Sequence, residues 1–452
     1  MFLLLSILFG VLIFYDFVYK RRQYPPGPLP YPLVGNLIEL KRLNYYDAIL
    51  KWKREYGPIF TFWMGEVPVV CFSDYDTIQE TLVKEADVFG ARFTYGRMST
   101  LIREATEVGM VDVSDRDIYQ DQRKFLLRTF REFGVGKNIM QEKILLECSH
   151  LHNDIKKEQE EMGSVEVIYR MDDMVGSIIC GILFGRRYGE DPLDYQFKEV
   201  LTSHMQLFIH PLSLIYSFCP FEFIANLWPM SWARDKAYKN GMFLMNFHRK
   251  EIEKHEKKFK EGLLPSEPED LVDAFLCEMY KSKIHEELDK VIASDRLIQM
   301  VDKPNLPYVN AVILEGLRHG NVLALNLMHK NDREITVRGH TIPQGSCVQP
   351  LICAVMYDET LFPNPKTFDP TRFIDKNGAL TCDQHVLAFS AGARQCIGKN
   401  LAMTELFLVM ANLLNQFTIE CVNSSNPPST FKNVGVTSSP TPFKAIFKSR
   451  FT

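Results

Sequence analysis

The chain opens on an almost wholly apolar run, MFLLLSILFGVLIFY, and the basic residues Lys20, Arg21 and Arg22 follow it. A run of this length lies near the lower limit for a helix that crosses a membrane. A secretory signal peptide is the competing interpretation, but no small-residue cleavage site follows and the positive charges come after the apolar run. We therefore predict an uncleaved transmembrane anchor helix over residues 1–19, with the rest of the protein on the cytoplasmic side.

Residues 20–36 form a basic, proline-rich stretch that includes the sequence PPGPLPYP. Such a density of proline excludes a helix and is typical of stiff, extended backbone. We predict a hinge here, which separates the anchor from the body of the protein over residues 37–452.

The body combines two kinds of hydrophobic pattern. IFTFWMGEVPVVCF (59–72) alternates and breaks at a glycine, which predicts a β-hairpin. From 77 to 289 the apolar spacing is mostly helical, as in QRKFLLRTFREF. Short strands are predicted around ITVRGHTIPQGSCVQP (335–350), and a last strong helix over NLAMTELFLVMANLLNQF (400–417). The pattern favours an α+β domain that is mainly helical, with small β-sheets.

The composition of the chain argues against several classes of protein. The net charge of −4 gives no reason to expect nucleic acid as a partner. The ten cysteines contain no C-x-x-C pair and no zinc spacing, which fits reduced thiols in a cytosol-facing protein. Gly134-Val135-Gly136 lacks the third glycine and the preceding strand of a dinucleotide loop. Any redox chemistry is therefore expected to take its electrons from a partner protein.

The stretch FSAGARQCIG (389–398) carries the strongest chemical signal. A helix is predicted to begin just after Gly398, and the positive end of its dipole would favour the thiolate of Cys396. Gly392 allows a tight turn, Arg394 offers a planar cation suited to a carboxylate, and Phe389 offers an aromatic face. Together these residues suit an iron porphyrin with acidic tails. A buried structural cysteine in a glycine-rich turn is the alternative that the residues alone leave open.

The pattern F-x-x-G-x-R-x-C-x-G resembles the haem-thiolate signature of the cytochrome P-450 family at every fixed position. The anchor and the proline-rich hinge resemble the membrane-anchored, microsomal type of that family. The resemblance implies a cytochrome P-450-like haem domain over 37–452. It also implies haem b as the cofactor, with iron ligated axially by the thiolate of Cys396 and with Phe389, Gly392, Arg394 and Gly398 around it.

Further matches extend along the chain. Glu315 and Arg318 in LEGLR match the family's E-x-x-R helix, and Arg372 in FDPTRF matches F-x-P-x-R-F, with Thr371 where glutamate is usual. The resemblance implies that Glu315, Arg318 and Arg372 form a buried charged network. A solvated surface pair is the ordinary alternative for two such residues on a helix.

Three more residues match positions that contact the haem propionates in the family. They are Arg123 in YQDQRKF, Arg92 in FGARF and His329 in LNLMHK. Tyr119 stands where the family has a tryptophan, and its hydroxyl can still donate a hydrogen bond. Each of these residues, taken alone, equally suits a surface arginine or a core histidine.

The chain departs from the family in one segment. The central helix that covers the distal haem face, with its A-G-x-[DE]-T stretch, has no counterpart, and the flanking segments join directly near 281–284. The acid–alcohol pair that relays protons to dioxygen is therefore missing, and no catalytic residue is assigned.

The resemblance implies a monooxygenase that inserts one oxygen atom from dioxygen into a small lipophilic substrate. The implied electron donor is an NADPH-dependent reductase, and the implied location is the endoplasmic reticulum membrane, with the catalytic domain facing the cytoplasm. The missing helix leaves an alternative open, namely a haem-binding protein or an inactive truncated variant without oxygenase activity.

Overall fold

The computed structural model describes residues 20–451 except 32–33, 44, 94–110, 112, 114, 133–137, 185–186, 190, 209, 219–221, 261–280, 382, 423–431 and 434–436. The predicted anchor over residues 1–19 therefore lies outside the described residues. None of the described helices combines the length and the apolar character needed to cross a membrane.

Helices dominate the described part of the chain, as predicted. The α-helices are α2 (Leu37–Leu43), α3 (Tyr45–Tyr56), α4 (Tyr75–Ile78), α6 (Arg116–Glu132), α7 (Asn138–Met162), α8 (Val167–Phe184), α9 (Leu193–Phe208), α10 (Pro211–Phe218), α11 (Glu222–Ala225), α12 (Met230–Lys260), α13 (Lys281–Val291), α14 (Pro307–Gly320), α15 (Ile352–Met356) and α16 (Lys399–Gln416).

Shorter helical turns connect them. Most are 3-10 turns, namely η2 (Lys20–Gln23), η5 (Met300–Asn305), η6 (Pro370–Phe373), η7 (Asp383–His385) and η8 (Gly392–Arg394), whereas η3 (Gln79–Lys84) is a π-helix. The strands are β1 (Ile59–Met64), β2 (Val67–Phe72), β3 (Ala91–Arg92), β4 (Val165–Glu166), β5 (His329–Lys330), β6 (Ile335–Val337), β7 (His340–Ile342), β8 (Cys347–Pro350), β9 (Phe417–Cys421), β10 (Lys432–Asn433), β11 (Ser439–Pro440) and β12 (Lys444–Ser449).

The predicted hairpin is confirmed. β1 and β2 pair antiparallel from Ile59↔Phe72 to Met64↔Val67, and Gly65 makes the turn with a positive φ of 60°. They form the edge of a five-stranded sheet in the order β1-β2-β8-β5-β3, in which β2 and β8 run parallel. The strands predicted around 335–350 are β6, β7 and β8. β8 joins the five-stranded sheet, whereas β6 and β7 pair with each other in a separate two-stranded sheet.

The proline-rich stretch lies along this hairpin. The Thr61 amide donates to the Pro26 carbonyl at 3.0 Å, and the Lys20 ammonium pairs with the Glu66 carboxylate at 2.9 Å. A Cβ on Gly27 would lie only 1.8 Å from the Thr61 carbonyl oxygen, so only glycine permits this close approach.

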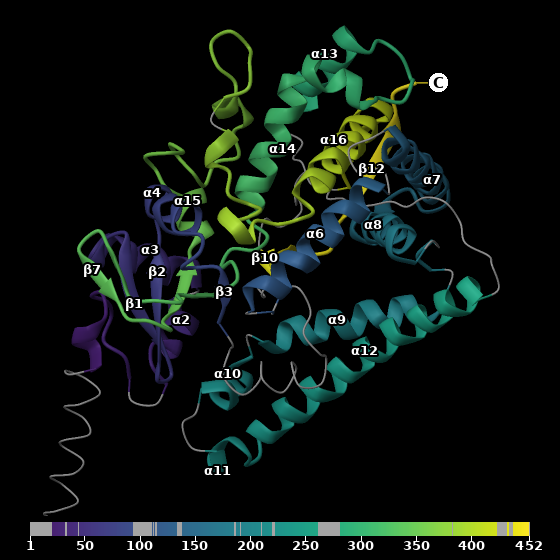
Figure 1. Cartoon of the computed structure of the whole chain (residues 1–452). Coiled ribbons are helices and arrows are strands. Elements are labelled where there is room, and N and C mark those ends of the chain that lie inside the picture. Colours follow the sequence, from purple (N-terminus) through teal and green to yellow (C-terminus); the bar gives the residue numbers. More distant parts are fainter. Residues whose placement is uncertain are drawn as a thin grey trace, which may run out of the picture.

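The main core lies among the helices. α14 and α16 lie side by side, α7 and α8 pack next to them, and the α9–α12 pair lies apart from this group (Figure 1). α16 confirms the last predicted helix, and its residues 405–415 are all buried. Apolar side chains from α7, α8, α13, α14, α16 and β12 share one cluster. The N-terminal end of α16 thereby holds the cysteine loop on a rigid support.

Candidate functional site

The loop 389–398 is closed by its own backbone hydrogen bonds. The Cys396 amide donates to the Phe389 carbonyl at 2.9 Å, and the Gln395 amide donates to the Gly392 carbonyl at 3.0 Å. Gly392 has a φ of +73°, and a Cβ there would lie 1.8 Å from the Leu82 carbonyl oxygen. Gly398 then begins α16 as its N-cap. Gly392 therefore permits a turn that no larger residue would allow, whereas a Cβ on Gly398 would meet only the Cys396 sulfur, at 3.8 Å.

Exposure separates Cys396 from the other described free cysteines. Cys71, Cys148, Cys180, Cys347 and Cys353 are buried, whereas Cys396 is exposed. Burial raises the pKa of the Cys148 and Cys353 thiols to about 12, so these thiols stay protonated. The structure therefore contradicts the alternative of a buried structural cysteine at position 396, and its sulfur is open to a ligand.

Arg394 points from this loop into the protein. Its Nε donates to the Gly90 carbonyl at 2.6 Å, and its Nη2 donates to the Val113 carbonyl at 2.8 Å. The guanidinium lies 3.5 Å from the centre of the Tyr119 ring. Burial, and next the positive charge of Arg92, lower the pKa of Arg394 to about 10. The loop thus borders a region of concentrated positive charge.

α6 contributes a second arginine and the tyrosine that replaces the expected tryptophan. The Tyr119 hydroxyl donates to the Ala393 carbonyl at 3.0 Å and accepts from Arg123 Nη1 at 2.9 Å. Arg123 Nη1 also donates to the carbonyl of Gln395 at 3.0 Å. The hydroxyl does donate, as the sequence allowed, and its acceptor is the cysteine loop itself.

Arg92 and His329 face each other across paired strands β3 and β5. His329 Nδ1 lies 2.7 Å from the Phe89 carbonyl and therefore donates to it, which leaves Nε2 to accept from Arg92 Nη1 at 3.0 Å. Burial, and next the charge of Arg92, lower the pKa of His329 to about 3. The imidazole is therefore neutral in the folded protein.

This neutrality predicts a pH dependence of stability. The unfolded chain protonates His329 below pH 6.5, whereas the folded chain does so only near 3, so stability present above 6.5 is lost as the pH falls. Relative to His329→Gln, the unmodified chain is expected to lose about 2 kcal/mol of unfolding free energy between pH 6.5 and 5. Urea unfolding at several pH values checks this, and parallel curves for the two proteins would refute it.

The residues around Cys396 fit a metal-bearing group with acidic tails. Three arginines from three segments concentrate positive charge here. Arg123 binds the Gln395 carbonyl, Arg394 belongs to the loop, and Arg92 lies close enough for its charge to lower the pKa of Arg394. Guanidinium groups are suited to binding carboxylates. An exposed thiol beside a helix N-terminus is a suitable ligand for iron. The close approach at Gly392 keeps the loop backbone against the Leu82 carbonyl, which holds the thiol-bearing turn in place.

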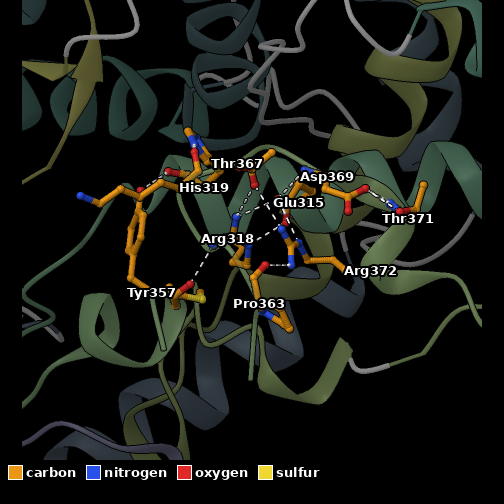
Figure 2. Close-up of polar contacts among 11 residues, drawn as sticks. Glu315, Arg318, His319, Tyr357, Pro363, Thr367, Asp369, Thr371 and Arg372 are labelled. Carbon is orange, nitrogen blue, oxygen red and sulfur yellow. Dashed lines mark hydrogen bonds and ion pairs between the residues drawn. The ribbon is translucent and has the colours of Figure 1, made fainter. Parts of the chain in front are cut away.

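The remaining predicted residues form a separate buried cluster, which Figure 2 shows. Both nitrogens of the Arg318 fork bind the Glu315 carboxylate, at 2.6 and 2.7 Å, and both side chains are fully buried. Arg372 Nε donates to Glu315 Oε1 at 3.3 Å, and the Asp369 amide donates to the same oxygen at 2.8 Å. The pair on α14 is therefore buried and fully hydrogen-bonded, not a solvated surface pair.

Two buried residues, on segments that adjoin the cysteine loop, were not predicted from the sequence. Glu405 lies fully buried in α16, and neither carboxylate oxygen has a hydrogen-bond partner within the part of the chain that the structure describes. Asn326 is buried and donates to the Ser390 hydroxyl of the cysteine loop. The sequence did hold a signal for each of them. It is a carboxylate within the apolar run NLAMTELFLVM for Glu405, and an asparagine within LALNLM for Asn326.

Comparison with known proteins is consistent with this geometry. A sequence model described as Cytochrome P450 matches residues 25–285 and 278–447. Cytochrome P450 2B19 of Mus musculus is 30% identical over 500 aligned positions, which cover 99% of each chain. Cytochrome P450 2B4 of Oryctolagus cuniculus is 29% identical, and cytochrome P450 2U1 of Rattus norvegicus is 28% identical, with 99% and 95% of those chains covered.

The alignments also bear on the segment near 281–284. The 500 positions aligned with the Mus musculus protein exceed the 452 residues of this chain by 48, so at least that many positions have no counterpart here. The two parts of the family match meet at 278–285. Residues 261–280 lie outside the described structure, and α13 begins at Lys281.

Proposed function

The chain belongs to the cytochrome P450 family, whose members are monooxygenases that bind haem b through a cysteine thiolate, and from this premise we propose that Cys396 is that ligand. The observation that carries the proposal is the exposure of Cys396, while the other free cysteines of the described chain are buried. A thiol must be accessible to ligate iron, and α16 begins directly behind it.

The neighbouring residues have distinct roles in this proposal. Arg92, Arg123 and Arg394 would hold the two acidic tails of haem by charge-assisted hydrogen bonds. Neutral His329, whose two ring nitrogens already bind the Phe89 carbonyl and Arg92, would orient Arg92 towards them. Phe389 and Gly398 would flank the thiolate, and Gly392 holds the turn closed against Leu82. When bound, haem supplies a redox-active iron whose thiolate ligand favours cleavage of the O–O bond. Glu315, Arg318 and Arg372 hold α14 to the segment that precedes the cysteine loop.

Substrate, electron donor and location follow as further parts of the proposal. Oxygen from dioxygen would be inserted into a small lipophilic substrate, with electrons from an NADPH-dependent reductase. The apolar run at 1–19 would anchor the chain in the endoplasmic reticulum membrane, with the haem domain over 37–452 facing the cytoplasm and the 20–36 stretch joining the two.

We also propose that the central helix of the family is missing near 281–284, where the two parts of the family match meet. The chain would then lack the acid–alcohol pair of that helix, so proton delivery by side chains is expected to be impaired. Haem binding depends on other residues, which lie in the cysteine loop, α6, β3 and β5. Binding and turnover are therefore expected to separate.

The test compares the full-length chain with Cys396→Ser in a reduced, carbon monoxide-bound difference spectrum. The unmodified chain is expected to show the red-shifted Soret band of thiolate ligation, and Cys396→Ser is expected to lose it. Cys148→Ala, which changes a buried thiol in α7, is the control and should keep the band. Absence of the band in the unmodified chain supplied with haem would overturn the proposal. A thiolate band without substrate oxidation would indicate a haem-binding protein without oxygenase activity.

A further inference from the structure

Two residues near the candidate site have left-handed backbone conformations without being glycine. Asn326 has a φ of +53° in the loop between α14 and β5, and Ser390 has a φ of +62° in the cysteine loop. Such conformations are unfavourable for residues with a side chain and persist where surrounding contacts hold them. The side chains of these two residues contact each other.

The side chains of the two residues are directly bonded. Asn326 Nδ2 donates to Ser390 Oγ at 2.8 Å, across 64 positions of sequence. The Leu327 amide donates to Asn326 Oδ1 at 2.8 Å, which fixes the orientation of the amide and directs its NH2 group at the hydroxyl. Asn326 is only 6% exposed, so the bond is shielded from water.

Ser390 lies at the centre of the turn that sets Cys396. Its amide donates to the Leu387 carbonyl at 2.8 Å, and its carbonyl accepts from Gln395 Nε2 at 3.3 Å. The preceding carbonyl, that of Phe389, accepts the Cys396 amide. A rotation of the backbone at Ser390 would therefore displace the acceptor that holds Cys396.

We propose that Asn326 is a positioning residue for Cys396, which acts by holding Ser390 in its left-handed conformation through the amide–hydroxyl bond. The relevance to haem rests on the proposed function, because it requires Cys396 to be the iron ligand. The ordering of the loop itself does not require haem. The loop before β5 and the loop before α16 then behave as one unit, joined by a side chain that a glycine at 326 would not provide.

The first measurement is amide hydrogen exchange on the haem-free, full-length chain, in peptides that cover residues 387–398. Asn326→Gly retains the backbone conformation and removes the side chain, and Ser390→Gly removes the hydroxyl in the same way. Each is expected to speed exchange in the loop about fivefold, which corresponds to the loss of one buried hydrogen bond. The double variant should exchange no faster than either single variant, because both remove the same contact.

Asn321→Gly is the matched control. Asn321 is also buried and left-handed, with a φ of +44°, but its amide has no hydrogen-bond partner among the described residues. Its replacement should leave exchange in 387–398 unchanged. Unchanged exchange in Asn326→Gly, or fully additive effects in the double variant, would overturn the proposal.

The second measurement adds haem and carbon monoxide under reducing conditions. Asn326→Gly is expected to convert a measurable share of the red-shifted Soret band into the band of a complex without thiolate ligation, whereas Asn321→Gly should not. A merely structural role would lower the yield of protein without changing this ratio. If the unmodified chain shows coupled exchange but no thiolate band, the proposed function fails and the positioning of the loop by Asn326 stands. If the band is present and Asn326→Gly leaves its ratio unchanged, the positioning of Cys396 is refuted.

Discussion

Replacing Arg318 with alanine is expected to lower the free energy of unfolding by about 3–5 kcal/mol, because it leaves a buried carboxylate without its charged partner. Glu315 and Arg318 are both fully buried, and the two form a bidentate pair at 2.6 and 2.7 Å. Arg372 reaches only one oxygen of Glu315, at 3.3 Å, and cannot replace the fork. Because whole domains are stable by only about 5–15 kcal/mol, a large part of the total would be lost. Urea unfolding of the full-length chain measures the change.

A matched control separates burial from charge. Lys448 pairs with Glu420 at 2.7 Å between β12 and β9, but its side chain is 60% exposed. Lys448→Ala is expected to cost less than about 1 kcal/mol, as is usual for solvated pairs. Replacing both buried partners, in Glu315→Leu/Arg318→Met, should recover part of the loss, because no charge is then stranded. Equal costs for Arg318→Ala and Lys448→Ala would show that the buried network contributes no more than a surface pair.

Elements with strong local periodicity could be predicted from the sequence. The β1–β2 hairpin followed from alternation around Gly65, and α16 followed from a long apolar helical pattern. The short strands β3 and β5 could not be predicted as a pair, because they have two residues each. Their register joins Ala91 to Lys330 and Arg92 to His329, which lie far apart in sequence. Pairing between such short segments depends on tertiary structure and leaves no periodic signal.

The same division holds within the candidate site. Gly392, Arg394 and Cys396 share one loop, so their motif alone places them together. The hydrogen bond from the Tyr119 hydroxyl to the Ala393 carbonyl depends instead on where α6 lies, and no local sequence pattern predicts that position. The buried pair on α14 could be predicted only through family resemblance, because an i, i+3 Glu–Arg pair is more often solvated. Residue chemistry was readable from the sequence, whereas the contacts between distant segments were not.

Glu405 is another residue whose surroundings could not be predicted from the sequence, and its burial predicts a second large effect on stability. It lies in the buried stretch of α16 with an exposed fraction of zero, and no described residue forms a hydrogen bond with either carboxylate oxygen. Burial raises the pKa of this carboxyl from 4.5 to about 11, so it is protonated and neutral in the folded protein. In the unfolded chain the same group ionises above pH 4.5. Between pH 4.5 and about 11, folding therefore takes up a proton at this carboxyl.

A raised folded-state pKa contributes stability that is fully present below pH 4.5 and is lost as the pH rises towards 11. Each pH unit in that interval costs about 1.4 kcal/mol, so the loss between pH 5 and 8 is about 4 kcal/mol. Glu405→Gln keeps the shape and removes the ionisation. The unfolding free energy of the unmodified chain, minus that of Glu405→Gln, is therefore expected to fall by this amount from pH 5 to pH 8.

The difference in unfolding free energy between the two proteins cancels every titration that they share, including that of His329. The slope of this difference against pH therefore depends on Glu405 alone. Glu420→Gln is the control, because that carboxylate is partly exposed and paired with Lys448, and its difference curve should be far shallower. A flat curve for Glu405→Gln would mean that the carboxyl is solvated or paired in solution. The expected slope would mean that α16, the helix behind Cys396, carries a neutral acid at its centre and becomes its least stable under alkaline conditions.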